Sequence, residues 1–176
     1  AIQRMSSAVP RVRKLALPAG LRAVLLAGGA DLSTPSVIAA LERLESEVRQ
    51  PLLSRMSVAS VASVAALESF DRDGFLRAGK EFVAAQTELA ALVAGDIVSA
   101  RTACLHGIAS QLGGFCKPSG AGGDGLLVAV IPDSEHETFT AAAMGQGFTR
   151  LECLVDLDGW RRERRTEPLE KREESS

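Results

Sequence analysis

A glycine-rich segment between residues 113 and 125 carries the clearest chemical potential in this sequence. It reads Gly-Gly-Phe-Cys-Lys-Pro-Ser-Gly-Ala-Gly-Gly-Asp-Gly. Glycines permit positive φ angles and let a ligand approach the backbone closely, and successive amides in such a turn can form an anion-binding nest. Ser119 adds a hydroxyl donor and Lys117 adds a cation near the same place. Together these groups predict a phosphate site.

Two familiar phosphate-binding loops do not match this segment. No Gly-Lys-Ser/Thr follows the glycines, which excludes a P-loop. The segment leads into the apolar run Leu126–Ile131, which is typical of a buried strand. A dinucleotide-binding loop would lead into a helix instead. One structural alternative stays open, namely that the glycines only make a tight connection between a helix and a strand.

Apolar patterning predicts the elements that must position this loop. A buried strand is expected at Leu21–Ala27, ended by Gly28, and helical spacing follows through most of residues 36–112. Pro51 is expected to break this region or open a new helix. The expected helices cover residues 36–48, 52–70, 71–93, 97–112 and 135–144, and the expected strands cover 2–5, 12–17, 21–27, 126–131 and 150–155. This order predicts an α/β fold in which helices pack on a small sheet.

Composition narrows the class of protein. The 176 residues have a net charge of −2 and no Tyr, which disfavours a nucleic-acid partner because single-strand binding uses aromatic stacking. No apolar run is long enough to span a bilayer, so no membrane partner is expected. Three widely spaced cysteines argue against a disulfide framework or a zinc site and favour a cytoplasmic setting. His106 and His136 lack a second ligand at metal spacing, so no metal site is predicted.

The segment at 117–123 resembles the third motif of the GHMP kinase family, which comprises galacto-, homoserine, mevalonate and phosphomevalonate kinases. Its Lys-Pro-Ser start is similar to the phosphomevalonate kinase version of that motif. Leu25–Pro35 is similar to the strand and Ser-Thr-Pro turn of the same kinases. The family usually has a third glycine and a Cys, as in Gly-Ala-Gly-Gly-Gly-Asp-Cys-Gly. This chain lacks both, which leaves the position of Asp124 in the loop open.

The resemblance implies a fold and an organisation for the chain. Residues 21–160 would form the C-terminal domain of a GHMP kinase, an α+β fold whose ferredoxin-like antiparallel sheet is backed by helices. Residues 1–20 would end the N-terminal kinase domain or connect to it, and residues 161–176 would form a charged, disordered tail. The family's nucleotide loop and catalytic Asp would then lie in an N-terminal half that this sequence does not contain. No catalytic residue is therefore expected here, and the chain alone is expected to be inactive.

The same resemblance implies an activity and a set of contacts. The parent protein would transfer the γ-phosphoryl of ATP, with Mg²⁺, onto 5-phosphomevalonate. Loop residues would face the phosphates, and Lys117 would either neutralise a phosphate or point to solvent. Ser33 and Thr34 would contact the substrate or only cap a helix. The expected loop contacts are Ser119, Gly120, Ala121, Gly122 and Gly123.

Two alternatives to this function stay open. Another GHMP kinase, such as a mevalonate or homoserine kinase, would use the same loop with a different acceptor. A non-catalytic helical interaction module could share the architecture without the activity, because one fold hosts many functions.

Overall fold

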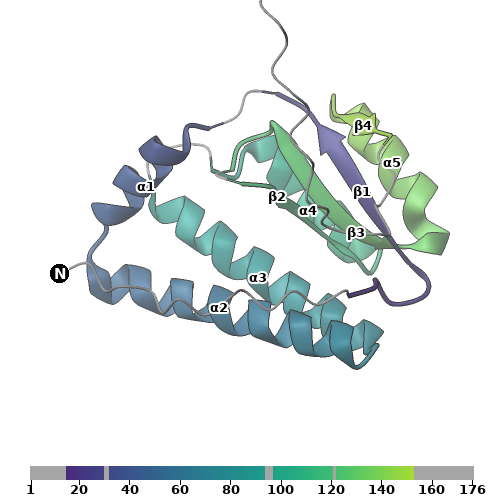
Figure 1. The fold of residues 1–176 in the computed structure, drawn as a ribbon. Helices are drawn as coiled ribbons and strands as arrows, with labels where there is room; N and C mark the ends of the chain where they lie inside the picture. The colour runs from purple at the N-terminus through teal and green to yellow at the C-terminus, as the bar shows by residue number, and fades with distance from the viewer. Residues whose placement is uncertain (1–14, 30–31, 94–96, 121, 153–176) are drawn as a thin grey trace, which may run out of the picture.

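The computed structural model describes residues 15–29, 32–93, 97–120 and 122–152. Within them, four strands form one sheet and five α-helices surround it (Figure 1). In chain order the elements are β1 (Leu21–Ala27), α1 (Thr34–Glu42), α2 (Ser46–Glu68), α3 (Arg72–Leu92), α4 (Ala100–Gln111), β2 (Phe115–Pro118), β3 (Leu126–Pro132), the 3₁₀ turn η1 (Asp133–Glu135), α5 (His136–Gly145) and β4 (Thr149–Leu151).

The sheet has the strand order β2-β3-β1-β4, and every neighbouring pair is antiparallel. β1 runs the full length of β3, from Leu21 opposite Pro132 to Ala27 opposite Leu126. One strand–helix–strand crossover joins β1 to β2 and another joins β3 to β4, while a hairpin joins β2 to β3. This is the ferredoxin-like topology, which confirms the expected antiparallel sheet backed by helices.

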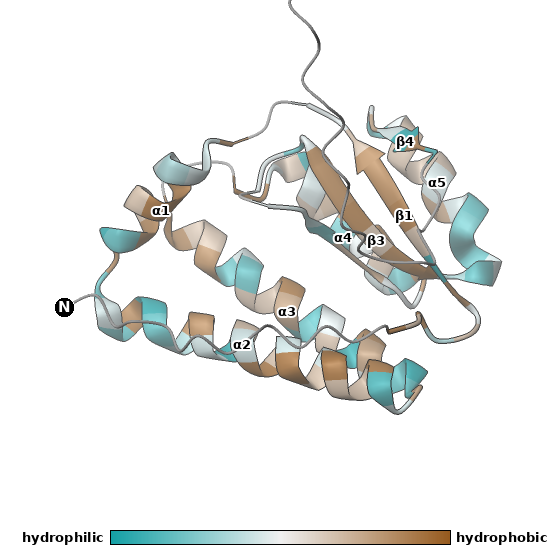
Figure 2. Cartoon of the chain, in the orientation of Figure 1, coloured by the Kyte–Doolittle hydropathy of each residue, from teal (hydrophilic) through white to brown (hydrophobic). Residues whose placement is uncertain are grey.

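Different helices cover the two faces of the sheet, and the core on one face is larger than the core on the other. Side chains alternate between faces along a strand, and in β1 Val24 and Leu26 point into the larger core, against α4 and α5. The opposite face packs on α2 and α3 through Leu21, Phe115 and Val130. The central strands are accordingly the most continuously hydrophobic part of the ribbon (Figure 2). The buried members of the larger core are Val24, Leu26, Leu105, Ala109, Cys116, Leu127, Ala129, Ile131, Phe139, Ala143 and Phe148.

Helices α2 and α3 form an antiparallel pair joined by a short turn (Figure 1). Asp71 caps α3, because its side chain accepts a hydrogen bond of 2.9 Å from the Gly74 amide. Farther along α3, the ring of Phe115 lies where a Cβ on Gly79 would sit, at 2.2 Å. The absence of a side chain at Gly79 therefore brings α3 against β2.

Two sequence-based expectations about these elements were wrong. The expected helix 36–48 is two pieces, since α1 ends at Glu42 and α2 begins at Ser46. Pro51 neither breaks nor opens a helix but lies inside α2. A proline there removes one backbone hydrogen bond, and the helix continues because Leu52, Ala59 and Ala66 are buried along its length.

The glycine-rich segment also differs from its expected form. The segment contains a strand that the sequence did not predict, because Phe115–Pro118 forms β2, so Lys117 and Pro118 are strand residues. β4 covers only Thr149–Leu151, and the rest of the expected strand 150–155 lies, from residue 153 on, outside the described residues. The first expected strand, at 2–5, and the tail 161–176 also lie outside them, while residues 15–17 of the second form no strand. In the described part of the chain, no helix is long and apolar enough to cross a membrane.

We expect Gly79→Ala to lower the free energy of unfolding by about 1–3 kcal/mol, because the new methyl group would overlap the Phe115 ring. The matched control is Gly107→Ala on α4, where no atom from outside the adjoining helix backbone lies within 4 Å of the position that the new methyl group would take. That change should raise stability by up to about 1 kcal/mol through helix propensity. Urea denaturation of the full-length protein measures both. Equal effects of the two substitutions would contradict the close packing of α3 on β2.

Candidate functional site

The loop at residues 119–125 closes the hairpin between β2 and β3. The Ser119 amide donates to the Leu126 carbonyl at 2.8 Å, which extends the strand ladder into the base of the loop. At the far side of the loop, the Gly28 amide donates to the Asp124 carbonyl at 2.9 Å. The end of β1 is therefore tied to the same loop, and the segment predicted to bind phosphate is anchored at both ends.

Three of the four loop glycines have positive φ angles, and of these three, two are buried and one is exposed. Gly120, Gly122 and Gly123 have φ angles of 71°, 110° and 79°, in the region that disfavours other residues. A Cβ on buried Gly122 would lie 2.7 Å from the Ile97 carbonyl oxygen, and the Gly123 amide already donates to that oxygen. Gly120 is exposed, and a Cβ added there would meet no atom within 4 Å. Packing thus explains Gly122 and Gly123 without a ligand, whereas Gly120 is open to one.

The Ser119 hydroxyl adjoins this open position. Among the described residues it has no hydrogen-bond partner, and the side chain is partly exposed. The amides of Ser119 and Gly123 are engaged within the protein, so neither is available to a phosphate. Of the loop residues predicted to contact phosphate, the Ser119 hydroxyl and the backbone of Gly120 are left open to a ligand in the described part of the loop. Ala121, the other predicted contact, lies outside the described residues.

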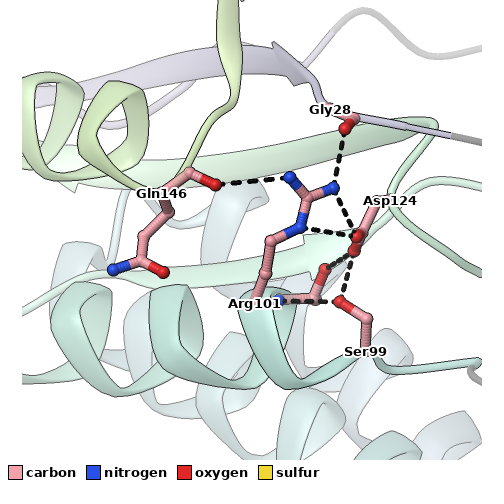
Figure 3. A network of polar contacts seen from close by, with 6 residues as sticks. Gly28, Ser99, Arg101, Asp124 and Gln146 are labelled. Atoms are coloured by element: carbon pink, nitrogen blue, oxygen red, sulfur yellow. Dashed lines mark hydrogen bonds and ion pairs between the residues drawn. The ribbon is translucent and has the colours of Figure 1, made fainter.

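Asp124 is the centre of a polar network that holds this loop on α4 (Figure 3). One carboxylate oxygen accepts from the Ser99 and Thr102 hydroxyls, the latter at 2.6 Å. Ser99 is also the N-cap of α4, since its hydroxyl oxygen accepts from the Thr102 amide at 3.0 Å. The positive end of the helix dipole favours a carboxylate at this place.

Arg101 binds the other carboxylate oxygen and reaches two more segments. Its Nε and Nη2 donate to Asp124 Oδ2 at 3.1 and 2.7 Å. Nη2 also donates to the Gly28 carbonyl at 2.7 Å, and Nη1 to the Gln146 carbonyl at 3.3 Å. The guanidinium lies 4.8 Å from the centre of the Phe148 ring. One side chain therefore connects the glycine loop, the end of β1 and the turn between α5 and β4 (Figure 3).

This network lowers the pKa of Asp124. Burial alone raises it, but the hydrogen bonds from Ser99, Thr102 and Arg101, together with the charge of Arg101, outweigh burial. Because both carboxylate oxygens are engaged, Asp124 serves to hold the loop rather than to accept a proton. Within the described residues, no three His, Cys, Asp or Glu side chains gather as a metal site. Both oxygens of the Asp124 carboxylate are already engaged, so this acid is not free to hold the Mg²⁺ that the resemblance implies.

Lys117 lies on β2 and its ammonium is turned toward α3. Its Nζ donates to the Pro118 carbonyl at 2.8 Å and lies 5.5 Å from the centre of the Phe82 ring. Burial lowers the pKa of Lys117. Neither contact involves the glycine loop, so a role in phosphate binding would require this side chain to turn.

Ser33 and Thr34 lie at the start of α1, as the sequence predicted. Ser33 is the N-cap residue, yet its side chain makes no capping hydrogen bond. Both residues are exposed. Thr34 lines a cavity of about 300 Å³ that Gly120 also lines. The structure thus brings the Ser-Thr-Pro turn and the glycine loop to one cavity, although some 85 residues separate them in the sequence.

Sequence reasoning missed the residues that hold the loop. Ser99 had a detectable signal, because a serine followed by a helical pattern is a common N-cap. Arg101 had a weaker one, since a cation in the first turn of a helix opposes the helix dipole unless an acid lies nearby. Asp124 was noticed but given no role. Nothing local indicated that Gly28 and Gln146 would share one guanidinium.

No protein-family model and no curated protein matches this sequence. Solved structures do match its fold. The Lin0012 protein from Listeria innocua aligns with a TM-score of 0.73 and 20% identity over 80% of this chain and 41% of its own. The phosphomevalonate kinase from Streptococcus pneumoniae aligns with a TM-score of 0.60 and 21% identity over 76% of this chain and 40% of its own.

Two further solved structures align with this chain over a similar share of its length. The S. pneumoniae enzyme in complex with phosphomevalonate and AMPPNP aligns with a TM-score of 0.62 and 20% identity. The L. major mevalonate kinase in complex with R-mevalonate aligns with a TM-score of 0.60 and 15% identity over 78% of this chain and 44% of its own. The chain spans about two fifths of the length of these proteins. It therefore has the fold of the C-terminal portion of GHMP kinases.

We expect Asp124→Asn to lower the free energy of unfolding by about 2–3 kcal/mol at neutral pH, because an amide cannot accept at both positions. The pKa of Asp124 is lower in the folded than in the unfolded state. Its contribution is therefore complete above the unfolded value of about 4 and is lost as the pH falls through the folded value. Urea denaturation of the full-length protein should show the difference from wild type shrinking below about pH 4.

Asp133→Asn is the matched control, since Asp133 forms only a half-exposed pair with Arg22. It should change stability by no more than about 1 kcal/mol at neutral pH. A gap between wild type and Asp124→Asn that stays constant from neutral pH to about pH 3 would contradict a charged, hydrogen-bonded Asp124.

Proposed function

We propose that this chain is the C-terminal part of an ATP-dependent kinase that phosphorylates 5-phosphomevalonate to 5-diphosphomevalonate. One observation carries the proposal: the glycine loop presents the unpartnered hydroxyl of Ser119 beside exposed Gly120, on a hairpin anchored by Asp124. The fold it shares with GHMP kinases supports a phosphotransferase, and the Lys-Pro-Ser start of the motif supports the narrower acceptor.

The loop's part in such a reaction is positional and electrostatic. Phosphoryl transfer spreads negative charge over the equatorial oxygens of the transferred group, and catalysis comes mainly from placing the reactants and stabilising that charge. Ser119 would donate its hydroxyl to a phosphate oxygen, and the backbone at Gly120 would allow a close approach. Ser33 and Thr34 would contact the acceptor across the shared cavity.

The catalytic machinery would come from the rest of the protein. The neighbours align over only about two fifths of their length, and none of the described residues here is assigned as catalytic. We propose that an N-terminal half supplies the nucleotide loop, the catalytic Asp and the ligands for Mg²⁺. An open groove of about 920 Å³ along β1 and β4, where Ala23 is exposed, provides a face on which that half could pack.

The proposal is tested by ADP release from the full-length protein with ATP, Mg²⁺ and one acceptor at a time: 5-phosphomevalonate, mevalonate or homoserine. We expect turnover with 5-phosphomevalonate alone. Ser119→Ala should lower kcat/KM by about tenfold to a hundredfold, which is the usual value of a hydrogen bond to a charged group. Turnover with mevalonate or homoserine instead would assign another member of the GHMP kinases.

Ser134→Ala is the control for the loop variant. Ser134 is exposed in η1, at the end of β3 opposite the glycine loop, and its loss should leave kcat/KM unchanged. If the folded protein releases no ADP with any of the three acceptors, the kinase proposal fails and a non-catalytic module becomes the better account.

A further inference from the structure

Helix α2 carries the triplet Ser-Val-Ala three times in succession, from Ser57 to Ala65. The valines of these triplets are three residues apart, and on a helix this spacing places them in one row along the surface. They are Val58, Val61 and Val64, with exposed fractions of 67%, 68% and 45%. The triplets therefore build a valine ridge that faces away from the protein.

The surface of α2 around the valine ridge lacks the charges of a helix that faces water. No Asp, Glu, Lys, Arg or His occurs from Met56 to Leu67. A helix at the surface normally turns its apolar row toward the core and its charged residues outward. α2 already has an inward row, in Leu52, Ala59 and Ala66. The valine ridge is thus a second apolar row, and exposed apolar side chains gathered in one patch are typical of a protein–protein contact.

The position of α2 leaves the valine ridge free in the kinase proposed above. α2 packs mainly on α3, and α3 rather than α2 packs against β2 (Figure 1). The groove in which the N-terminal half is proposed to pack runs along β1 and β4, and none of its described lining residues belongs to α2. The ridge therefore remains open to a further partner.

We propose that the valine ridge binds the same ridge on a second copy of this chain, with the two α2 helices antiparallel and a two-fold axis at Val61. In such a pair, each residue before Val61 faces the residue that lies equally far after Val61 in the other copy. Val61 then meets its own counterpart, and Val58 meets Val64 in both directions. This inference goes beyond the proposed kinase activity and does not depend on it.

The triplet repeat fits this arrangement because its order of small, large and small side chains reads the same in both directions. Exposed Ser60 would face exposed Ala62 of the other copy, and exposed Ser57 would face exposed Ala65. Small residues beside a ridge leave a groove into which the opposing ridge packs. The absence of charge supports the same partner, because a surface that meets itself brings like charges together, and like charges across an interface are unfavourable.

Other kinds of partner fit this surface less well. Helices that bind a lipid surface carry Lys or Arg on their polar face, and a nucleic acid also requires cations. The arginine nearest the ridge in sequence, Arg55, is already engaged by Glu81 and Glu88 of α3 at 2.8 and 2.6 Å. A charge-free ridge is therefore best matched by another charge-free ridge.

The proposed contact is small. Stable complexes bury about 1,200–2,000 Å², and smaller interfaces are typical of weak, transient ones. One helix from each copy provides less than the stable range. We therefore expect a reversible dimer with a dissociation constant of about 1–100 μM.

Sedimentation equilibrium of the full-length protein between about 1 and 300 μM tests the proposal. The weight-average mass of wild type should rise from that of a monomer toward that of a dimer. Val61→Glu places two carboxylates face to face at the two-fold axis and should weaken association by at least about a hundredfold. Because Val61 is largely exposed, this change should shift the thermal unfolding midpoint by no more than about 2 °C.

A charge swap tests the two-fold axis itself. Val61→Lys alone should remain monomeric, whereas an equal mixture of the Val61→Glu and Val61→Lys chains should dimerise, since opposite charges then meet at the axis. Met144→Glu is the matched control, because Met144 is 61% exposed but lies on α5. Its replacement should keep the wild-type association.

Three results would overturn the proposal. Wild type that stays monomeric up to about 300 μM would do so, even if no variant folds. An unchanged mass for Val61→Glu, or a charge-swapped mixture that stays monomeric, would place the contact elsewhere. A fall of the unfolding midpoint of Val61→Glu with no change in association would show that another part of the same chain covers the ridge.

Discussion

Arg101 holds together three segments that are far apart in the sequence. Its guanidinium binds the Asp124 carboxylate, the Gly28 carbonyl and the Gln146 carbonyl. The pair with Asp124 is partly shielded from water, since the Asp124 side chain is 14% exposed and that of Arg101 is 40% exposed. The planar fork of arginine suits such multiple acceptors better than the point charge of lysine. The contacts of Arg101 and the hydrogen bond from the Gly28 amide to the Asp124 carbonyl together fix the glycine loop relative to β1.

Some residues of the glycine loop are required by the fold, whereas others make no contact that the fold requires. Gly122 and Gly123 are buried against Ile97, and their positive φ angles follow from the path of the chain. Asp124 is fully engaged by α4. Ser119 and Gly120 are left facing outward, with a free hydroxyl and an unobstructed backbone among the described residues. The sequence left open whether the glycines make a helix-to-strand connection or a phosphate site. In the structure the loop connects two strands, β2 and β3; Gly122 and Gly123 serve that connection, and Ser119 and Gly120 remain open to a ligand.

Local patterns predicted much of the fold. The runs at Leu21–Ala27 and Leu126–Ile131 are strands because they are continuous, apolar and bounded by turn residues. β2 was not predicted, because its four residues, one of them Pro118, are too few to show the alternation of apolar and polar side chains that is typical of a strand. The continuation of α2 through Pro51 was equally hidden, since it depends on packing against α3. The site was predicted as a loop, but its anchor was not, because the contacts of Arg101 with Gly28 and Gln146 span 73 and 45 residues.

A crystal structure of the full-length protein with AMPPNP and 5-phosphomevalonate would test the central claim most directly, because the claim concerns which atoms meet the phosphates. We predict that the terminal phosphate of AMPPNP accepts a hydrogen bond from the Ser119 hydroxyl and lies against Gly120, while the contacts between Arg101 and Asp124 stay as they are here. Phosphates bound elsewhere, with the glycine loop facing empty solvent, would contradict the account and reduce the loop to a structural turn.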